Sequence, residues 1–403
     1  MTRYLLIQAT GAVQAGQLAT LEEALTSLGM RWQDVQQHSM AGRTTLMVLL
    51  ENSDEVLSAA QLQRRLAATF EQAGLNGHID AITEAQWQAL APSAQRQIMT
   101  VMGPVLSPEA IAQAERLAHH HGFSTVSVER RSGDTTFAQP DSMGECLQFV
   151  LQGSADMAVL RQEALTLGAA LGVDIVFQPD DLWRHRRRLV CFDMDSTLIK
   201  TEVINELAER HGVHDRVAEI TERAMRGELD FRQSFTQRMA MLEGLDQSVL
   251  NDIATTLPLM EGAEHLFAEL KRLGYRTAIL SGGFTCFAQA LQARLGIDEV
   301  YANVLDINEQ GKVTGQVVEP IVDAQCKADT LRVLAQQQGI ALEQTVAVGD
   351  GANDLKMLSI AGLGVAWHAK PKVKAQARQA VSTLGLDALL YLLGHDARSL
   401  AVG

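Results

Sequence analysis

Short apolar segments alternate with helix-like segments from residue 189 to the C-terminus, and this alternation constrains the fold more than any other feature. Clear strand candidates are 189–192, 277–280 and 346–349, each dominated by aliphatic residues. Strands that alternate with helices form parallel sheets covered by helices on both faces. In such sheets, ligands bind at the carboxyl ends of the strands. The sequence therefore predicts a doubly wound α/β domain whose chemistry lies at one end of its strands.

The first 180 residues follow another order, which is strand, helix, strand, strand, helix, strand, and this order occurs twice. The strand candidates are 3–9, 44–50, 78–82, 97–102, 123–128, 146–151 and 173–177. The helix candidates are 18–28, 57–70, a segment that begins near Ser107, and 157–170. The two halves share this order of elements but not their amino-acid sequence, and the repeat predicts two βαββαβ modules.

A chain of 403 residues is too long for one ordinary domain. The patterns above divide it into a first module at 1–88, a second module at 95–180 and an α/β domain at 186–403. The basic run 184–188 directly precedes the first strand of the α/β domain. A short charge run is most often a solvated surface, so we expect these side chains in a linker exposed to water.

Composition and charge exclude several classes of protein. The chain is 47% hydrophobic and 20% charged, which excludes disorder. Its net charge of −14 argues against a nucleic-acid partner. Its four cysteines form no Cys-x-x-Cys pair, so zinc and dithiol chemistry have no support. No segment approaches the roughly 20 apolar residues that span a bilayer, and the apolar N-terminal run is too short for a signal peptide. We expect a cytoplasmic protein that does not enter membranes.

Two acidic clusters each follow an apolar strand candidate. Asp193 and Asp195 follow the strand 189–192, and Asp350 and Asp354 follow 346–349. Adjacent carboxylates repel one another and are normally stabilised by a cation. Hard oxygen ligands favour Mg²⁺. We therefore expect the two clusters to lie on neighbouring strands and to share one Mg²⁺ site.

Groups that suit a phosphate oxygen follow the remaining strand candidate. The strand 277–280 runs into Ser281 and Gly282, where a hydroxyl and exposed main-chain amides are available to an anion. Lys327 begins a helix candidate and carries an ammonium group that is able to neutralise a phosphoryl group.

Taken in order, these four motifs resemble those of the haloacid dehalogenase superfamily of phosphotransferases, which implies a Rossmann-like parallel sheet. The resemblance covers residues 188–403. The insert at approximately 201–258 is similar to the helical cap of the phosphoserine phosphatase family. The two N-terminal modules resemble ACT domains, which are small amino-acid-sensing units that accompany enzymes of amino-acid metabolism.

The resemblance implies how the carboxylates act. Asp193 is the nucleophile that forms an aspartyl-phosphate, and Asp195 is the general acid and base. The Mg²⁺ ligands are Asp193, the main chain of Asp195, and Asp350, with Asp354 behind them as support. The implied reaction is the hydrolysis of O-phospho-L-serine to L-serine and phosphate, the last step of serine biosynthesis.

The resemblance also implies the substrate-binding residues. Ser281, Gly282 and Lys327 stabilise the phosphoryl oxygens, and Asn353 orients near the phosphoryl group.

In the cap, Glu202 and Arg238 bind the ammonium and carboxylate of the substrate, because arginine grips a carboxylate with two hydrogen bonds. Met225 and Phe231 form an apolar lid that excludes water.

Three alternatives stay open at this stage. The aspartyl-phosphate can pass to an alcohol such as homoserine, which would make the protein a phosphotransferase. A broader phosphomonoesterase of small molecules would use the same fold. An amino-acid sensor with an inactive catalytic domain would require a lost nucleophile or metal ligand, but Asp193, Asp195 and Asp350 are all present.

The ACT-like modules have two possible roles. The loops after their first strands, 10–16 and 103–107, keep glycine but lack the acidic residue that such ligand loops carry. Binding of an amino-acid effector and a structural or dimerising role are both compatible with this pattern. A homodimer formed through the sheets of these modules is our hypothesis for the assembly.

Overall fold

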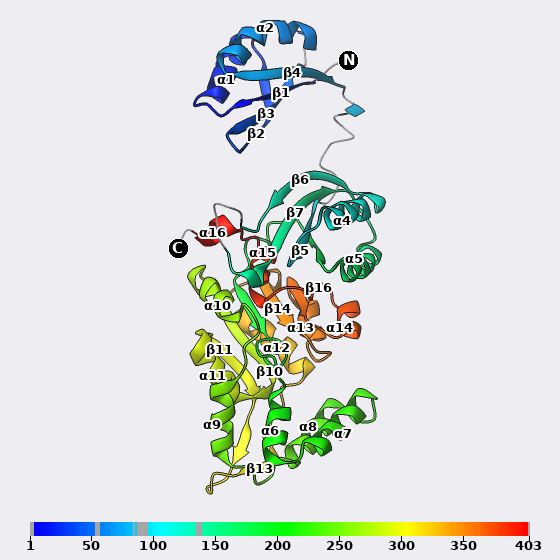
Figure 1. Ribbon diagram of the computed structural model, residues 1–403, viewed down its shortest axis with the longest axis vertical. Coiled ribbons are helices and arrows are strands. Elements are labelled where there is room, and N and C mark those ends of the chain that lie inside the picture. Colours follow the sequence, from blue (N-terminus) through cyan, green and yellow to red (C-terminus); the bar gives the residue numbers. More distant parts are fainter. Residues whose placement is uncertain (1–3, 53–56, 84, 87–95, 134–138, 402–403) are drawn as a thin grey trace. The chain divides into compact units, whose positions relative to one another are not determined.

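The computed structural model describes residues 4–52, 57–83, 85–86, 96–133 and 139–401. The chain divides into two compact units, Met1–Ala94 and Gln95–Gly403 (Figure 1).

The first unit is a four-stranded antiparallel sheet with two helices. Its elements are β1 (Tyr4–Ala12), α1 (Gln17–Ser27), β2 (Arg31–Met40), β3 (Arg43–Glu51), α2 (Ala59–Gln72) and β4 (Leu75–Ile82). The strand order is β2-β3-β1-β4, with every neighbouring pair antiparallel. Alternate residues of β1, such as Leu5 and Ile7, pack against Leu62 and Leu66 of α2 in one core. The predicted βαββαβ module is confirmed.

The second unit begins with a module of the same topology. Its elements are β5 (Arg96–Gly103), α4 (Pro108–His120), β6 (Ser124–Arg130), η1 (Asp141–Met143), β7 (Glu145–Gln152), α5 (Met157–Leu171) and β8 (Asp174–Pro179). The strand order β6-β7-β5-β8 repeats that of the first module, and again all pairs are antiparallel. Ser107 caps α4 by accepting a hydrogen bond from the Ala110 amide at 3.1 Å, as the sequence predicts.

The repeat extends to a close contact between glycines. A side chain on Gly11, in β1, would lie 2.2 Å from the carbonyl oxygen of Gly74, which follows α2. A side chain on Gly103, in β5, would lie 3.3 Å from the carbonyl oxygen of Gly172, which follows α5. In both modules, therefore, a glycine at the end of the first strand allows the chain that leaves the second helix to approach closely. Close packing therefore explains one glycine in each of the loops 10–16 and 103–107, and no bound ligand is needed to explain it.

The α/β domain contains a six-stranded parallel sheet. Its strands are β9 (Leu189–Phe192), β10 (Arg276–Phe284), β11 (Glu299–Asn303), β14 (Thr345–Gly349), β15 (Leu363–Trp367) and β16 (Gln379–Val381). The order is β11-β10-β9-β14-β15-β16. The first strand in sequence, β9, therefore lies between β10 and β14, which brings together the carboxyl ends of the three strands that carry motifs.

Helices cover both faces of this sheet. Val190 and Phe192 of β9 belong to one hydrophobic core, whereas Leu189 and Cys191 belong to the other. The helices of the first core are α10 (Ala263–Arg272) and α11 (Thr285–Leu295), and those of the second are α12 (Ala324–Gln337), α13 (Leu355–Ile360) and α14 (Pro371–Gln376). The predicted doubly wound α/β fold is confirmed.

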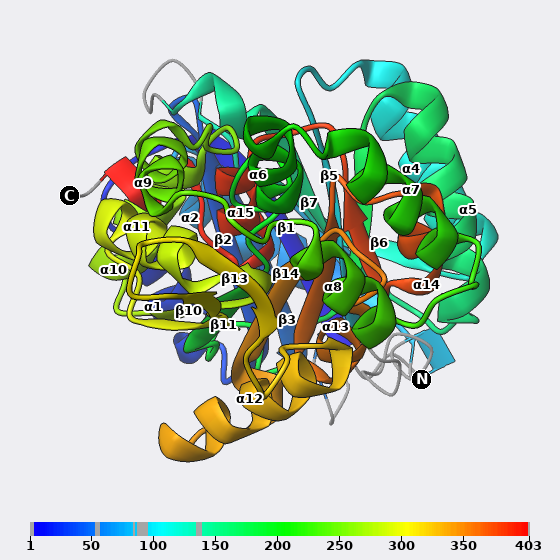
Figure 2. The same ribbon diagram turned by 90° about the horizontal axis from the view of Figure 1, so that it is seen from below.

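Four helices and a hairpin form a cap on this domain. They are α6 (Val203–His211), α7 (His214–Met225), α8 (Phe231–Ala240), α9 (Gln247–Thr256), β12 (Leu305–Ile307) and β13 (Val313–Val317). Figure 2 looks onto this end of the unit, and in Figure 1 it lies away from β5–β8. Asp230 begins α8 with a capping box that includes Gln233. Phe235 and Met239 of α8 are buried in the core beneath the cap.

The C-terminal segment joins the second module to the α/β domain. Its elements are η3 (Leu386–Ala388), α15 (Leu389–Leu392) and α16 (Ala397–Ala401). A further short helical turn, η2 (Leu342–Gln344), precedes β14. The Gln148 side-chain amide, from β7, donates to the Tyr391 carbonyl at 2.9 Å. The Ser142 hydroxyl donates to the buried carboxylate of Asp387 at 2.7 Å. The two parts of this unit are thus joined by buried hydrogen bonds.

The expectation of a solvated basic run is wrong for two of its arginines. Arg184 and Arg187 are buried. Arg184 donates to the Gln148 side chain at 2.8 Å, and Arg187 donates to the Leu392 carbonyl at 2.9 Å and the Gln178 side chain at 3.0 Å. Because the run passes between the second module and the α/β domain, these two guanidinium groups supply donors to both. The neighbouring Arg186 and Arg188 are exposed, as expected.

Within the described residues, no helix is both long enough and apolar enough to cross a membrane.

We expect Arg187→Ala to lower the free energy of unfolding by about 2–4 kcal/mol, because it leaves two buried acceptors without a donor. The matched control is Arg186→Ala, which removes an exposed neighbour and should change the free energy by less than about 0.5 kcal/mol. Urea denaturation of the full chain measures both values. Equal losses from the two variants would contradict a structural role for the buried arginine.

Candidate active site

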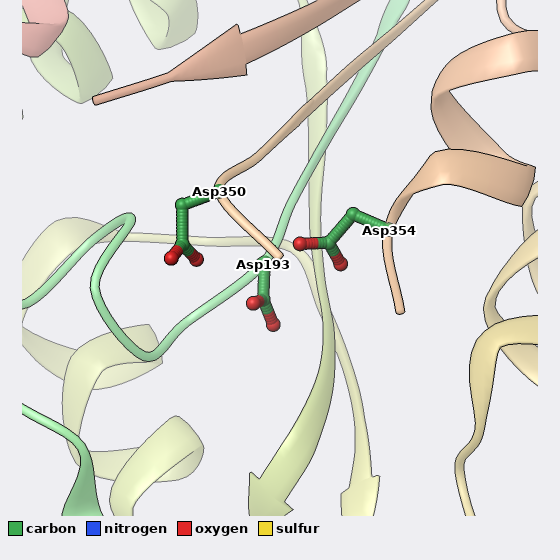
Figure 3. Close-up of side chains that lie close together, drawn as sticks. All are labelled: Asp193, Asp350 and Asp354. Atoms are coloured by element: carbon green, nitrogen blue, oxygen red, sulfur yellow. The ribbon is translucent and has the colours of Figure 1, made fainter. Parts of the chain in front are cut away.

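Three carboxylates converge at the carboxyl ends of β9 and β14. Asp193 directly follows β9, Asp350 directly follows β14, and Asp354 begins α13. An oxygen from each lies within 4.8 Å of the others. Figure 3 shows the three side chains close together. The two strands are held in register here, because the Asp193 amide donates to the Val348 carbonyl at 2.9 Å. The predicted meeting of the two acidic clusters is therefore seen in the structure.

Lys327 lies between two of these carboxylates. Its ammonium nitrogen is 2.7 Å from Asp193 Oδ1 and 2.7 Å from Asp354 Oδ1. It is fully buried, in the first turn of α12, which Asp323 caps. Burial opposes the charged form of this lysine, but the two carboxylates outweigh burial and raise its pKa above the usual range. Lys327 therefore stays a cation.

The carboxylate cluster carries more negative charge than Lys327 balances. Burial and the charge of Asp193 raise the pKa of Asp350 to about 8 and the pKa of Asp354 to about 7. Three ionised carboxylates and one ammonium would leave a net charge of −2, which one divalent cation balances. Carboxylate oxygens are the ligands that Mg²⁺ and Ca²⁺ prefer. The donor set therefore fits a hard divalent metal ion.

Asp195 is oriented away from this cluster, toward the cap. Its Oδ1 accepts a hydrogen bond from the Val203 amide at 2.9 Å, at the start of the cap helix α6. Burial, followed by the charges of Glu202 and Asp193, raises the pKa of Asp195 well above its usual range. These surroundings favour the protonated form of the Asp195 carboxyl group.

The third strand end, that of β10, supplies a hydroxyl and main-chain amides. Ser281 is fully buried, and its hydroxyl oxygen accepts a hydrogen bond from the Gly283 amide at 2.9 Å. The Gly282 carbonyl accepts a hydrogen bond from the Asn303 side chain at 2.8 Å. An added side chain on Gly282 would lie 3.5 Å from Phe231 and 4.0 Å from the amide nitrogen of Asn353. Phe231 and Asn353 therefore lie close to Gly282.

Comparisons with known proteins agree with this geometry. A family model for haloacid dehalogenase-like hydrolases matches residues 187–362, and one for the ACT domain matches residues 3–80. A phosphoserine phosphatase from Streptomyces coelicolor is 39% identical over 391 residues, which are 97% of this chain and 92% of that protein. The chain belongs to the phosphoserine phosphatase family of haloacid dehalogenase-like hydrolases.

Two further relatives support this membership. The phosphoserine phosphatase SerB2 of Mycobacterium tuberculosis is 38% identical over 390 residues, with 96% of this chain and 92% of that protein covered. A solved Vibrio cholerae structure, titled as a probable phosphoserine phosphatase in unliganded form, has a TM-score of 0.58 and 37% identity. That match covers 77% of this chain and 88% of the other. Both relatives extend the similarity beyond the α/β domain.

The cap brings two oppositely charged side chains toward Asp195 without pairing them. Glu202 is exposed and precedes α6, where its Oε1 accepts a hydrogen bond from the Ser196 hydroxyl at 3.3 Å. Arg238 is on α8, and its Nε is buried without a hydrogen-bond partner among the described residues. Burial lowers the pKa of Arg238, while the charges of Glu202 and Asp195 act in the opposite direction. The three groups therefore lie near enough to influence one another electrostatically.

Of the two side chains predicted to form the apolar lid, the structure describes only that of Phe231. Phe231 begins α8 and is half-buried, with its ring 6.1 Å from that of Phe235 in a stacked arrangement. Met225 ends α7, but its side chain lies outside the part of the chain that the structure describes.

Sequence reasoning gave no role to three residues at the site, although one of them, Thr197, ends the motif Asp193-x-Asp195-x-Thr197. Thr197 is fully buried, and its hydroxyl donates to Asp350 at 3.4 Å. Asn303 ends β11 and links Gly282 to the Val322 amide, which donates to the Asn303 side chain at 2.8 Å. A side chain on Gly283 would lie 2.5 Å from Asp195 Oδ2, so glycine leaves room for that carboxylate. The motif threonine and the second glycine were visible in the sequence, whereas nothing in the sequence singles out Asn303.

The crowded carboxylates predict a pH dependence for the metal-free protein. An unfolded aspartate titrates near pH ~4, whereas the pKa of Asp350 in the folded state is about 8. The folded state therefore binds more protons than the unfolded state within this window, and the free energy of unfolding falls as pH rises from about 4 to about 8. Urea denaturation in EDTA, repeated across this range, measures the decrease.

Asp350→Asn should reduce this decrease, because it removes one of the buried charges. The control is Asp252→Asn, which changes an exposed aspartate on α9 and should follow the unchanged protein. A metal-free protein whose stability rises over the window would contradict the burial of these carboxylates.

Proposed function

We propose that this protein is a phosphoserine phosphatase that hydrolyses O-phospho-L-serine to L-serine and phosphate, with Asp193 as the nucleophile. The observation that carries the proposal is the position of Asp193 beside Lys327 and Asp350, at the end of β9, which lies between β10 and β14. The family membership supports the same reaction.

The first step transfers the phosphoryl group to Asp193. A carboxylate oxygen of Asp193 attacks phosphorus, the bond between phosphorus and the serine oxygen breaks, and an aspartyl-phosphate forms. Asp195 gives its proton to the departing serine oxygen, which leaves as a hydroxyl. The hydrogen bond from the Val203 amide keeps the Asp195 carboxyl directed toward the cap side, where the leaving group lies.

The second step releases phosphate. Asp195, now ionised, accepts a proton from a water molecule whose oxygen attacks phosphorus. The bond from phosphorus to Asp193 breaks, so that the carboxylate is restored and phosphate departs. Lys327 lies 2.7 Å from Asp193 and offers positive charge to the phosphoryl oxygens, and we assign the Ser281 hydroxyl and the Gly282 amide to the same oxygens. Asn353 lies close to Gly282.

We propose Mg²⁺ as the metal, held by Asp193, Asp350 and the main chain of Asp195, with Asp354 in support through Lys327. When bound, the ion supplies positive charge to the phosphoryl oxygens and balances the carboxylates. The three carboxylate oxygens within 4.8 Å support this assignment.

The unpaired charges of the cap favour phosphoserine over other phosphomonoesters. The substrate has an ammonium group, which we assign to Glu202, and a carboxylate, which we assign to Arg238. The buried Nε of Arg238 has no protein partner among the described residues, and a buried donor without a partner costs about 1–3 kcal/mol. A substrate carboxylate would satisfy it. Phe231 and Met225 would cover the bound substrate.

The deciding experiment measures phosphate release from O-phospho-L-serine with Mg²⁺ and with EDTA. We expect Mg²⁺-dependent release that falls at least about a thousandfold in Asp193→Asn, since this variant lacks the nucleophile. Asp252→Asn should keep full activity. Release that needs added homoserine would indicate a phosphotransferase, and equal release from p-nitrophenyl phosphate would indicate a broader phosphomonoesterase.

The role of the cap is tested by Arg238→Lys. We expect kcat/KM for phosphoserine to fall about 10- to 100-fold, because lysine cannot make the paired contact with a carboxylate. The value for p-nitrophenyl phosphate, which has no such carboxylate, should change little. Arg216→Lys, on the exposed face of the cap helix α7, is the control. An equal loss of kcat/KM for both substrates would mean that Arg238 supports the fold and does not bind the substrate carboxylate.

Binding of an amino-acid effector by the ACT-like modules, a homodimer and a cytoplasmic location stay predictions from the sequence.

A further inference from the structure

A cavity of about 610 Å³ lies between the second module and the α/β domain, away from the carboxylate cluster. Its walls come from α5 and β8 on one side and from α14 and β16 on the other. Small side chains leave the space open, and they include Ala158, Ala164, Ala169, Ala375, Ala377 and Ala380. The volume is in the range of small-molecule sites, which is about 300–1,000 Å³.

Three cations line this cavity. They are Arg161 of α5, Lys374 of α14 and Arg378, which directly precedes β16. Among the described residues, none of the three side chains makes an ion pair or a hydrogen bond. The Nε of Arg161 is also buried without a partner. Arg378 is exposed, whereas Arg161 and Lys374 are half-buried, and together they give this wall a positive charge in a chain whose net charge is −14.

The acidic residue of the cavity lining already has hydrogen-bond donors within the protein. Asp174 is buried and accepts hydrogen bonds from the Ser382 amide at 2.9 Å and from the Thr383 amide and hydroxyl at 2.9 and 2.7 Å. The formal charge of the lining is therefore three positive charges and one negative charge, or +2. In addition, burial, followed by the charge of Arg378, lowers the pKa of Arg161.

We propose that this cavity binds a small anionic metabolite through phosphate or carboxylate oxygens, with Arg161, Lys374 and Arg378 as its ligands. An anion with two negative charges balances the lining, satisfies the buried Arg161 donor and relieves the repulsion between the arginines. The arginine fork suits planar or tetrahedral oxyanions. Because α5 and α14 belong to different parts of the unit, a bound anion links the second module to the α/β domain.

The test is the thermal unfolding of the full chain with inorganic phosphate or, in a separate arm, malonate. EDTA is present to remove metal-dependent binding at the active site, and ionic strength is constant. A ligand that binds only the folded state raises the unfolding temperature in a saturable way. We expect such a shift in the wild-type protein. A shift with phosphate alone identifies a phosphate site, and a shift with malonate alone identifies a carboxylate site.

The decisive comparison is between two lysines of one helix. Lys374→Gln removes a cation of the cavity, whereas Lys372→Gln removes an exposed cation of α14 that does not line it. We expect the dissociation constant to rise about tenfold in Lys374→Gln and to stay unchanged in Lys372→Gln. Arg161→Gln should weaken binding in the same way, which provides a second variant if one of them folds poorly.

Activity separates this site from the active site. Because Lys374 contacts no group of the reaction, kcat for phosphoserine should stay within about twofold in Lys374→Gln. An anion that binds at Lys327 would shift the unfolding temperature of Lys372→Gln and Lys374→Gln by the same amount. The difference between the shifts of the two variants therefore measures binding in the cavity alone. Equal shifts in all variants, or no shift with either anion in the wild-type protein, would overturn the proposal.

Discussion

The active site depends on one buried lysine held between two carboxylates. Lys327 contacts Asp193 and Asp354 at 2.7 Å each, and each of these residues comes from a different element of the α/β domain. The ammonium group partly offsets the repulsion among the carboxylates, which would otherwise oppose the approach of β9 and β14 at their carboxyl ends. Removing a partner from such a buried pair leaves an uncompensated charge, so the contacts that serve the proposed reaction also support the fold.

The same group explains how the site can change charge during the reaction. While Asp193 is free, Lys327 is bound to it by a strong charge-assisted hydrogen bond. In the proposed mechanism, a phosphoryl group on Asp193 would find the positive charge already beside its oxygens, so no rearrangement would be needed. Preorganised charge of this kind is worth more in a buried site than in water. The position of Asp354 behind Lys327 keeps the ammonium group in place in both states.

The sequence allowed the fold and the acidic motifs to be predicted for a simple reason. Strands buried on both faces are continuous apolar runs, and each run here ends directly in the residues that carry chemistry. Neighbouring strands then bring those residues together. By contrast, β2 gave no signal, because nearly all of its ten residues are exposed and show no apolar alternation. The βαββαβ order required a strand there, but local sequence did not locate it.

Residues whose role depends on distant partners could not be predicted. Asn303 is a lone polar residue at a strand end. Its side chain forms hydrogen bonds with main-chain groups of Gly282 and Val322, which only the folded chain brings near it. Arg184 and Arg187 belong to a run that looks like a solvated linker, and their partners lie in β7, β8 and the C-terminal segment. Charge runs carry no local signal that separates a buried arginine from an exposed one.

The burial of these arginines also decides where the chain can be divided. A cut near residue 186 would separate Arg187 from Gln178 and the Tyr391 carbonyl from its donor Gln148, and it would expose the edge of β16 that β8 now covers. A cut near residue 95 falls between the two compact units. Although the chemistry belongs to the C-terminal half, the shortest piece of this chain that keeps its interior intact starts with the second ACT-like module.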